Sequence, residues 1–403
     1  MRLTPEEFKV SAITGIAHAL VHAAMLVFPA ILEPMRADLG VSVFAVSIIG
    51  NISYLSFGLL AFPSGLLADR IGSRRVMAFS AGGIAVGAAG TSAAAYLTHN
   101  IYAVGAFMGI LGLGAAFYHP AGLSLVGKRF GTVEKGMAYH GIWGMFGLAG
   151  GPLLAGTITR VSSYHLAYAA IAVLAVCLAP LPLLMLKQSH DKDIRMDAAD
   201  AESDGRSRLP GLIVIFIVVG IIGLAFNGAT SFLPTRLSVI DGLFTANLIT
   251  TVALLVGIIG QYAGAFLAMK LRKEILLSAA MALTGFMLIG LGGTSGLWLV
   301  PAALLFGLFH FTTQPLTNSL ISRLAPGGRK GLAFGISFTI NFGVGSFGTG
   351  LAGFLADNVS LGYAFIILGL ISFLGVPLAL VIVLMGKRRR PASRRTVEAY
   401  REI

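Results

Sequence analysis

The sequence predicts an all-α membrane protein of twelve transmembrane helices, arranged as two pseudo-symmetric six-helix bundles. Three observations predict this fold class. Twelve apolar runs are long enough to cross the hydrocarbon core, which takes roughly 20 helical residues. Basic residues gather at alternate ends of these runs, and several residues recur at a fixed offset between the two halves of the chain.

The composition favours lipid as the solvent of most side chains. Of the 403 residues, 56% are hydrophobic and 11% are charged, whereas an average soluble domain is about 25% charged. A globular core in water could not hide so much apolar surface. Helices are the expected spanning form, because lipid cannot satisfy free backbone groups and the runs lack the alternation of barrel strands.

The apolar runs define the predicted helices directly. They cover residues 8–33, 43–68, 75–97, 101–127, 136–159, 165–186, 211–235, 244–269, 275–293, 297–322, 331–356 and 362–386. The first run is too long for the apolar region of a signal peptide, so it is interpreted as a spanning helix.

The basic residues predict the orientation. Of 29 Lys and Arg residues, all but Arg36, Arg160 and Arg236 fall on one side when the N-terminus is cytoplasmic. The positive-inside rule then places both termini in the cytoplasm. The formal charge of +12 therefore reflects topology, and no nucleic-acid partner is expected. A plasma-membrane location is expected, which in a bacterium is the inner membrane.

One long polar segment divides the chain. Residues 187–208 mix basic and acidic side chains, which predicts a flexible cytoplasmic linker. The predicted domains are an N-terminal bundle, the linker, a C-terminal bundle and a basic cytoplasmic tail. Their boundaries are 1–186, 187–208, 209–390 and 391–403.

The two halves are related in sequence. A shift of 195 positions aligns helices 4 and 5 with helices 10 and 11. The aligned pairs are Pro120 with Pro315, His119 with Gln314, Ser124 with Ser319, and Lys135 with Lys330. Parallel repeats about an axis along the membrane normal are typical of transporters that bind substrate near the midplane between the halves.

The loop after helix 2 carries the most specific motif, Gly65-Leu-Leu-Ala-Asp69-Arg70-Ile-Gly-Ser-Arg74-Arg75. It closely resembles the signature of the major facilitator superfamily. The resemblance implies a cytoplasmic gate, in which Gly65 lets helix 2 approach helix 11 and Asp69 faces the positive N-terminal end of helix 11. The three arginines would complete this gate, although Arg74 and Arg75 could serve only as topology signals.

Helix 5 carries the run Gly147-Leu-Ala-Gly-Gly151-Pro152, which resembles the G-x-x-x-G-P motif of facilitator exporters. The resemblance implies an exporter or antiporter with a hinge at Gly151 and Pro152. A plain packing face is the alternative, because small residues let membrane helices approach closely.

Helices 1, 4 and 5 resemble the fosmidomycin-resistance branch of the superfamily. The resemblance rests on Phe117-Tyr-His119-Pro120 and on the Gly-Pro-Leu-Leu-Ala sequence from Gly151. That branch carries a histidine in helix 1, followed four residues later by an aspartate. His18 matches the histidine, but His22 stands in place of the acid, which puts a carboxylate-based proton step in doubt.

The candidate substrate-binding residues are polar or aromatic side chains within the predicted helices. The resemblance implies a cavity lined by helices 1, 4, 7 and 10, which carry all of the candidates except Tyr54, Trp143 and Asn341. The candidates are His18, His22, Tyr54, Tyr118, His119, Trp143, Asn227, His310, Gln314 and Asn341. Ionisable residues within a membrane are functional candidates, and histidine titrates nearest physiological pH. We therefore expect His18 and His22 to share at most one proton. The alternative is that both only form hydrogen bonds with substrate, and His140 is interpreted as an interhelical hydrogen-bond partner.

The predicted function is secondary active transport of a small organic molecule by alternating access, with proton coupling and export. An uptake carrier or a uniporter is the alternative, and a non-transporting sensor or scaffold is a third reading. An enzyme is not expected, because no P-loop or nucleophile–base constellation is found. No cofactor or metal is expected, since Cys177 is the only cysteine and a structural thiolate site needs several. The expected partners are substrate, protons and lipid, and a monomer is expected.

Overall fold

The computed structural model describes residues 3–131, 133–186, 205–326 and 330–387. The described chain holds twelve helical segments that are long and apolar enough to cross a membrane, from Pro5–Leu39 to Leu361–Met385. The predicted count of twelve is therefore confirmed. Because many large apolar side chains remain exposed on the outside of the bundle, a lipid environment accounts for the surface as well.

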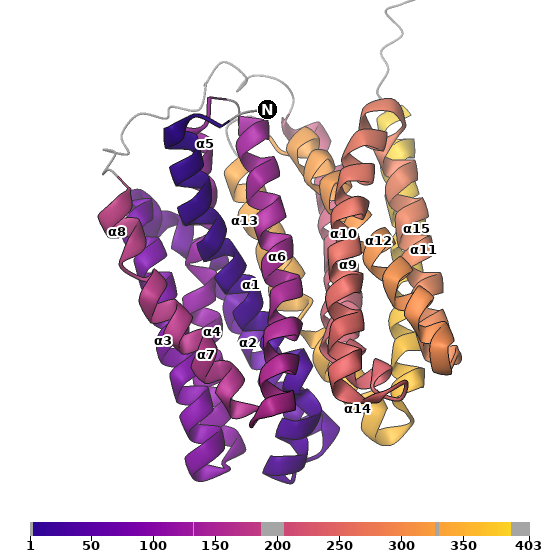
Figure 1. Ribbon diagram of the computed structural model, residues 1–403. Coiled ribbons are helices and arrows are strands. Elements are labelled where there is room, and N and C mark those ends of the chain that lie inside the picture. Colours follow the sequence, from indigo (N-terminus) through magenta and orange to yellow (C-terminus); the bar gives the residue numbers. More distant parts are fainter. Residues whose placement is uncertain (1–2, 132, 187–204, 327–329, 388–403) are drawn as a thin grey trace, which may run out of the picture.

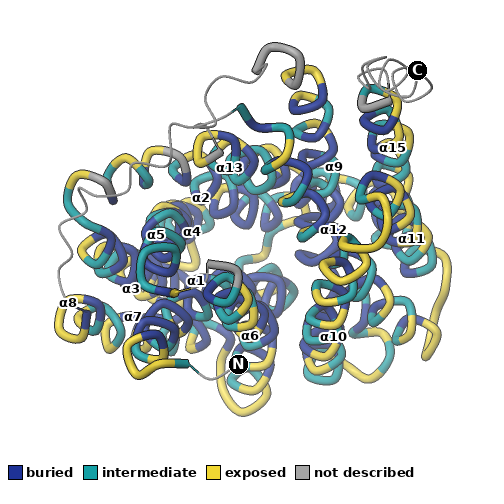
Figure 2. The backbone as a smooth tube through the Cα atoms, turned by 90° about the horizontal axis from the view of Figure 1, so that it is seen from above, coloured by how far each residue is buried: buried dark blue, intermediate teal, exposed yellow. Residues whose placement is uncertain are grey.

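The helices form two groups side by side (Figures 1 and 2). The first group contains α1 (Pro5–Leu39), α2 (Val43–Ile71), α3 (Ser73–Thr98), α4 (Ile101–Ala116), α5 (Tyr118–Arg129), α6 (Val133–Val161), α7 (His165–Leu178) and α8 (Leu181–Met185). The second contains α9 (Gly205–Leu237), α10 (Gly242–Lys270), α11 (Lys273–Gly293), η2 (Gly296–Trp298), α12 (Leu299–Leu324), α13 (Lys330–Phe338), η3 (Thr339–Val344), α14 (Phe347–Asn358) and α15 (Leu361–Lys387). The predicted linker and basic tail fall largely outside the described residues.

Helix α1 begins and ends at clear sequence signals. The Thr4 hydroxyl accepts a hydrogen bond from the Glu7 amide at 3.2 Å, and the Glu7 carboxylate accepts one from the Thr4 amide at 2.9 Å. This capping box, followed by Pro5 at the first helical position, starts the helix. Gly40 ends it with φ of 63°, a conformation that favours glycine.

The predicted helix 101–127 is divided at Phe117 into α4 and α5. Pro120 has no N–H to donate to the carbonyl of Ala116, so the helical hydrogen bond is lost at this point. The Ser64 hydroxyl of α2 lies 3.1 Å from that carbonyl and shares its proton between it and the Ala61 carbonyl, at 2.8 Å. The sixth predicted helix is likewise divided, into α7 and α8, and the eleventh contains a π-helical segment, η3. Such segments are frequent at functional sites.

Small residues bring the helices of each half close together. A Cβ atom at Gly147 of α6 would lie 2.3 Å from the backbone oxygen of Ala19 in α1. In the second half, a Cβ at Gly307 of α12 would lie 2.0 Å from the backbone oxygen of Ala253 in α10. Each helix pair therefore packs backbone against backbone, as expected where lipid gives helices no hydrophobic drive to associate.

The two halves contact each other near the end of the bundle where α1 meets α2, which we call the opposite end. It lies opposite to the end where α1 begins and α15 ends (Figure 1). The Asp357 carboxylate of α14 accepts hydrogen bonds from the amides of Val43 and Phe44 at 3.0 and 2.7 Å. The Asn247 amide of α10 donates to the Ala30 carbonyl of α1 at 3.2 Å. The halves are thus joined at the opposite end.

Candidate functional site

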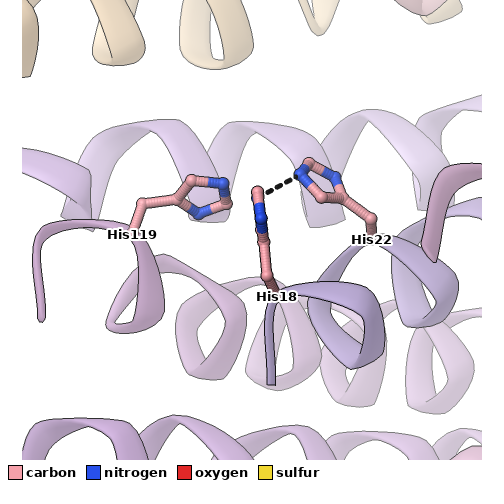
Figure 3. A group of neighbouring side chains, drawn as sticks. All are labelled: His18, His22 and His119. Carbon is pink, nitrogen blue, oxygen red and sulfur yellow. Dashed lines mark hydrogen bonds between the residues drawn. The ribbon is translucent and has the colours of Figure 1, made fainter. Parts of the chain in front are cut away.

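Four imidazoles from three helices meet inside the first half, and we call them the histidine cluster: His18 and His22 of α1, His119 of α5 and His140 of α6. The Nε2 atoms of His18 and His22 lie 3.0 Å apart. The ring of His18 stacks on that of His140 at 4.0 Å, and the His119 ring lies 5.0 Å from His18 and 5.2 Å from His22. Figure 3 shows the rings of His18, His22 and His119 directed toward one another.

Hydrogen bonding assigns the tautomer of His18. Its Nδ1 lies 2.9 Å from the backbone oxygen of His140. A carbonyl oxygen can only accept, so Nδ1 carries the proton and a neutral His18 presents a bare Nε2. The neighbouring Nε2 of His22 then donates to it. The Nε2 lone pair of His18 therefore has a fixed direction, and a ligand could take the place of His22 as its partner.

Neighbouring residues fix the His18 ring. A Cβ atom at Gly144 of α6 would lie 2.5 Å from Cε1 of His18, so only glycine leaves room for the imidazole. The ring of Tyr118 stacks on His18 at 5.4 Å, and its hydroxyl donates to the backbone oxygen of Thr14. The break between α4 and α5 gives Tyr118 and His119 this placement at the start of α5.

Some nitrogens of the cluster have no partner. His18, His119 and His140 are only 7%, 5% and 6% exposed. Within the described residues, Nδ1 of His119 and both ring nitrogens of His140 form no hydrogen bond. An unsatisfied buried polar group costs ~1–3 kcal/mol, so its presence calls for an explanation in function.

Aromatic residues of both halves cover His119. Its ring lies 5.3 Å from Phe57 of α2 and 5.3 Å from Phe338 of α13, and Phe57 lies 4.6 Å from Phe342 of η3. We call Phe57, Phe338 and Phe342 the aromatic seam. Sequence reasoning missed the seam, because a phenylalanine in an apolar run does not reveal which neighbour it faces. The histidine cluster thus lies against the seam between the two halves.

The predicted site residues of the second half lie apart from the cluster, with no ring contact or hydrogen bond between the two groups in the described chain. The Asn227 amide donates to the backbone oxygen of Asn341 at 3.2 Å. His310 stacks on Phe226 at 4.6 Å. The amide oxygen of Gln314 accepts from Gln261 at 2.6 Å.

Two predicted binding residues of the first half do not contact the histidine rings. Tyr54 is buried in α2, and its hydroxyl has no hydrogen-bond partner among the described residues. Trp143 of α6 covers Gly15, where an added Cβ would lie 2.2 Å from the indole ring. Both stay predictions as substrate ligands.

The apolar pockets lie away from the histidine cluster. One of about 430 Å³ is lined by aliphatic and aromatic side chains of α9 and η3, and one of about 250 Å³ lies between α2 and the α13–η3 segment. Neither is lined by a histidine. These grooves suit lipid tails or packing neighbours better than a polar substrate.

The predicted gate stays a prediction. The side chain of Asp69 lies outside the described residues. Arg74 donates to the backbone oxygen of Leu186 at 2.9 Å, within the first half. The remaining arginines lie on the surface: Arg70 is exposed, and Arg75 of α3 donates to the backbone oxygen of Ile71, the last residue of α2, at 3.4 Å.

The glycines of the gate differ in how closely they pack. A Cβ atom at Gly65 would meet Pro120 of α5 at an ordinary 3.6 Å. At Gly151 it would lie 2.8 Å from the backbone oxygen of Ala23 in α1. Pro152 is buried within α6. Gly151 therefore serves the packing of α6 on α1 in this conformation, and its role as a hinge stays a prediction.

Solved structures share the fold. A bacterial homologue of the human lysosomal transporter Spinster has a TM-score of 0.78 at 11% identity, over 95% of this chain and 98% of that chain. The nucleoside transporter NupG has 0.76 at 13% identity, over 94% and 99%. A POT family transporter in complex with a thioalcohol-conjugated peptide has 0.76 at 14% identity, over 94% and 96%.

Sequence comparisons give the family. No curated protein matches the sequence. The family model described as Major Facilitator Superfamily matches residues 14–349 and, in a second match, residues 215–402. These matches cover far more than half of the chain, and the fold and family are those of a transporter rather than an enzyme. The chain belongs to the Major Facilitator Superfamily.

Proposed function

We propose that this protein is a secondary transporter that moves a small organic molecule by alternating access. One observation carries the proposal: the polar histidine cluster of the first half lies against an aromatic seam to which both halves contribute. A ligand at His119 would contact both halves, so it could bind their open and closed arrangements differently. Such a difference is what a ligand needs to drive a conformational change.

The contacts at the opposite end support a two-state arrangement. Asp357 joins the halves through exposed polar contacts and Asn247 through a buried one. A rocking motion would break these contacts together, without disturbing the packing within each half. Transporters with parallel repeats move largely as such rigid bodies around a fixed site.

We further propose that a proton gradient drives transport, that transport is export, and that both termini are cytoplasmic in a plasma membrane. Proton coupling is supported by the direct contact of His18 with His22 in α1. Export is supported only by the exporter-like Gly151-Pro152 motif. The orientation is supported by the distribution of Lys and Arg.

A reconstitution experiment tests the proposal. Purified protein is screened by thermal shift against amino acids, dipeptides and nucleosides, because a ligand stabilises the state that binds it. A compound that stabilises the protein is then followed in proteoliposomes under a pH gradient and no substrate gradient. Uphill movement that is lost in His18→Gln and His22→Gln, and kept in His165→Gln, is the expected result.

Other outcomes decide between the alternatives. Movement that only equilibrates the compound would make the protein a uniporter or couple it to another ion. Uphill movement in the direction of the proton flux would mean uptake by symport. A protein that folds but neither binds nor moves any compound would favour the scaffold reading.

A further inference from the structure

We propose that His18, His22 and His119 form a binding site for a divalent transition-metal ion such as Zn²⁺, Cu²⁺ or Ni²⁺. The ion would arrive free or held by a small organic chelator. The candidate ligand nitrogens of the three residues all lie within 4.8 Å of one another, and Figure 3 shows how the rings converge. This departs from the expectation, based on sequence alone, that the chain has no metal site.

The distances fit a metal with little rearrangement. Imidazole nitrogens bind zinc at about 2.0–2.1 Å, so two ligands of a tetrahedral ion lie roughly 3.3 Å apart. The Nε2 atoms of His18 and His22 are already 3.0 Å apart. Histidines at positions i and i+4 of one helix are the pair that helical zinc sites use. A modest ring movement of His119 would bring in the third nitrogen.

The surroundings prepare His18 as a ligand. Its Nδ1–H donates to the His140 carbonyl at 2.9 Å, which is the arrangement found behind most metal-binding histidines because it fixes the ring and the tautomer. Its Nε2 lone pair then faces the centre of the cluster. His22 becomes a ligand by moving its proton from Nε2 to Nδ1. The unpartnered Nδ1 of His119 shows that this imidazole has no hydrogen bond there to lose.

The donor set selects the class of metal. Among the described residues no Asp, Glu or Cys joins the three histidines as a ligand. An all-imidazole site suits zinc, copper and nickel, whereas calcium and magnesium require oxygen ligands. Three protein ligands leave at least one coordination position for an outside group, as in sites that exchange their ligands.

The missing negative charge points to a chelate. Three neutral imidazoles cannot balance a divalent charge in a buried site, where an unpaired charge is costly. A carboxylate or amine of an organic chelator would fill the open position, and a carboxylate would also balance charge. The identification of a metal chelate as the transported cargo rests on the proposed function. The metal site itself does not depend on that function.

Direct titration tests the site. The full chain, purified in detergent and stripped with a chelating resin, is titrated with Cu²⁺, Zn²⁺, Ni²⁺ and Mg²⁺ by calorimetry. We expect one tightly bound transition ion per chain and no Mg²⁺ binding. His22→Gln and His119→Gln should each weaken binding by at least 10-fold. This is on the order of the affinity that metal sites lose when a residue that supports a ligand is removed. The matched control His165→Gln, at the start of α7, should bind like the wild type.

A spectroscopic readout separates ligand loss from misfolding. Bound Cu²⁺ should show nitrogen hyperfine coupling from three imidazoles in the wild type and from two in His22→Gln, a half-buried position that tolerates substitution better than His18. Gel filtration and thermal unfolding check that each variant is folded. Wild-type protein that binds no transition ion, or folded variants that bind it like the wild type, would overturn the site.

Transport measurements distinguish the free ion from a metal chelate, and the metal-site proposal from the transporter proposal. Proteoliposomes are loaded with zinc chloride or with zinc–citrate, and metal movement is followed by elemental analysis. Movement of zinc only with citrate identifies a chelate, and movement of both identifies the free ion as sufficient. Metal binding without movement of any compound leaves the site standing and contradicts the transporter. Transport of an organic compound by protein that binds no metal would support the transporter and overturn the metal site.

Discussion

The imidazole of His18 is enclosed by three groups from α5 and α6. The His140 ring stacks on it at 4.0 Å, the Tyr118 ring lies 5.4 Å from it, and the bare backbone of Gly144 lies against the ring edge. Protein interiors pack as densely as organic crystals. A single methyl group at Gly144 therefore has consequences for the ring, although it adds no charge and removes no hydrogen bond.

Gly144→Ala should displace His18 and impair the cluster. The added Cβ would lie 2.5 Å from Cε1, and overpacking of this kind costs ~1–3 kcal/mol, or on the order of 10- to 100-fold in affinity if the site absorbs it. Calorimetric Zn²⁺ titration measures the loss. Gly150→Ala on the same helix is the control, because its Cβ would meet nothing within 4 Å. Equal affinity in both variants would show that Gly144 does not position His18.

Sequence reasoning could find only part of the cluster. A spacing of four residues predicts that His18 and His22 lie on one face of a helix. The sequence predicts only a hydrogen-bonding role for His140, which stands four residues before the Gly144 that packs on His18. The four-residue spacing of His140 and Gly144 is the only signal in the sequence that His140 faces His18. It can be interpreted only when the face of α6 that packs against α1 is known, and the sequence does not give that face.

At the scale of elements, helix lengths were predictable and their interruptions were not. Apolar runs set the twelve spans, since the bilayer thickness fixes their length. The break at Phe117 depends on Pro120 and on a hydroxyl from another helix, Ser64, that satisfies the freed carbonyl of Ala116. A proline alone does not predict a break, because proline within α1 and within α12 leaves those helices continuous.

Ser64→Ala should destabilise the protein at the α4–α5 break. It leaves the Ala116 carbonyl without its partner, and an unsatisfied buried acceptor costs ~1–3 kcal/mol. Thermal unfolding in detergent, followed by tryptophan fluorescence, measures the lowered midpoint. Ser80→Ala is the control, since the buried Ser80 hydroxyl of α3 has no hydrogen-bond partner among the described residues. If both variants unfold at the wild-type temperature, Ser64 does not support the break.

At the scale of the whole molecule, α2 and α14 are the pair that joins the halves at the opposite end through Asp357. The Gly65–Arg75 signature is predicted to join helices 2 and 11, the same pair, at the other end. The bond of Asp357 to α2 spans more than 300 residues of chain, so no local pattern could reveal it. Acids at both ends of one helix pair would let the same two helices close either side.

Asp357→Asn should therefore open the opposite end. The carboxylate accepts from the first amides of α2, where the helix dipole favours negative charge. Asp357 is exposed, so the charge is worth only ~0.3–1 kcal/mol, roughly a two- to fivefold shift in population.

Spin labels at Val161→Cys and Val239→Cys, two exposed positions on opposite halves, report the separation in a Cys177→Ala background. The population of long distances should rise in Asp357→Asn. Asp241→Asn is the control, because the Asp241 carboxylate accepts a hydrogen bond from Thr245 of its own half. Its distances should match those of the wild type. Identical distributions in both variants would show that Asp357 does not hold the halves together.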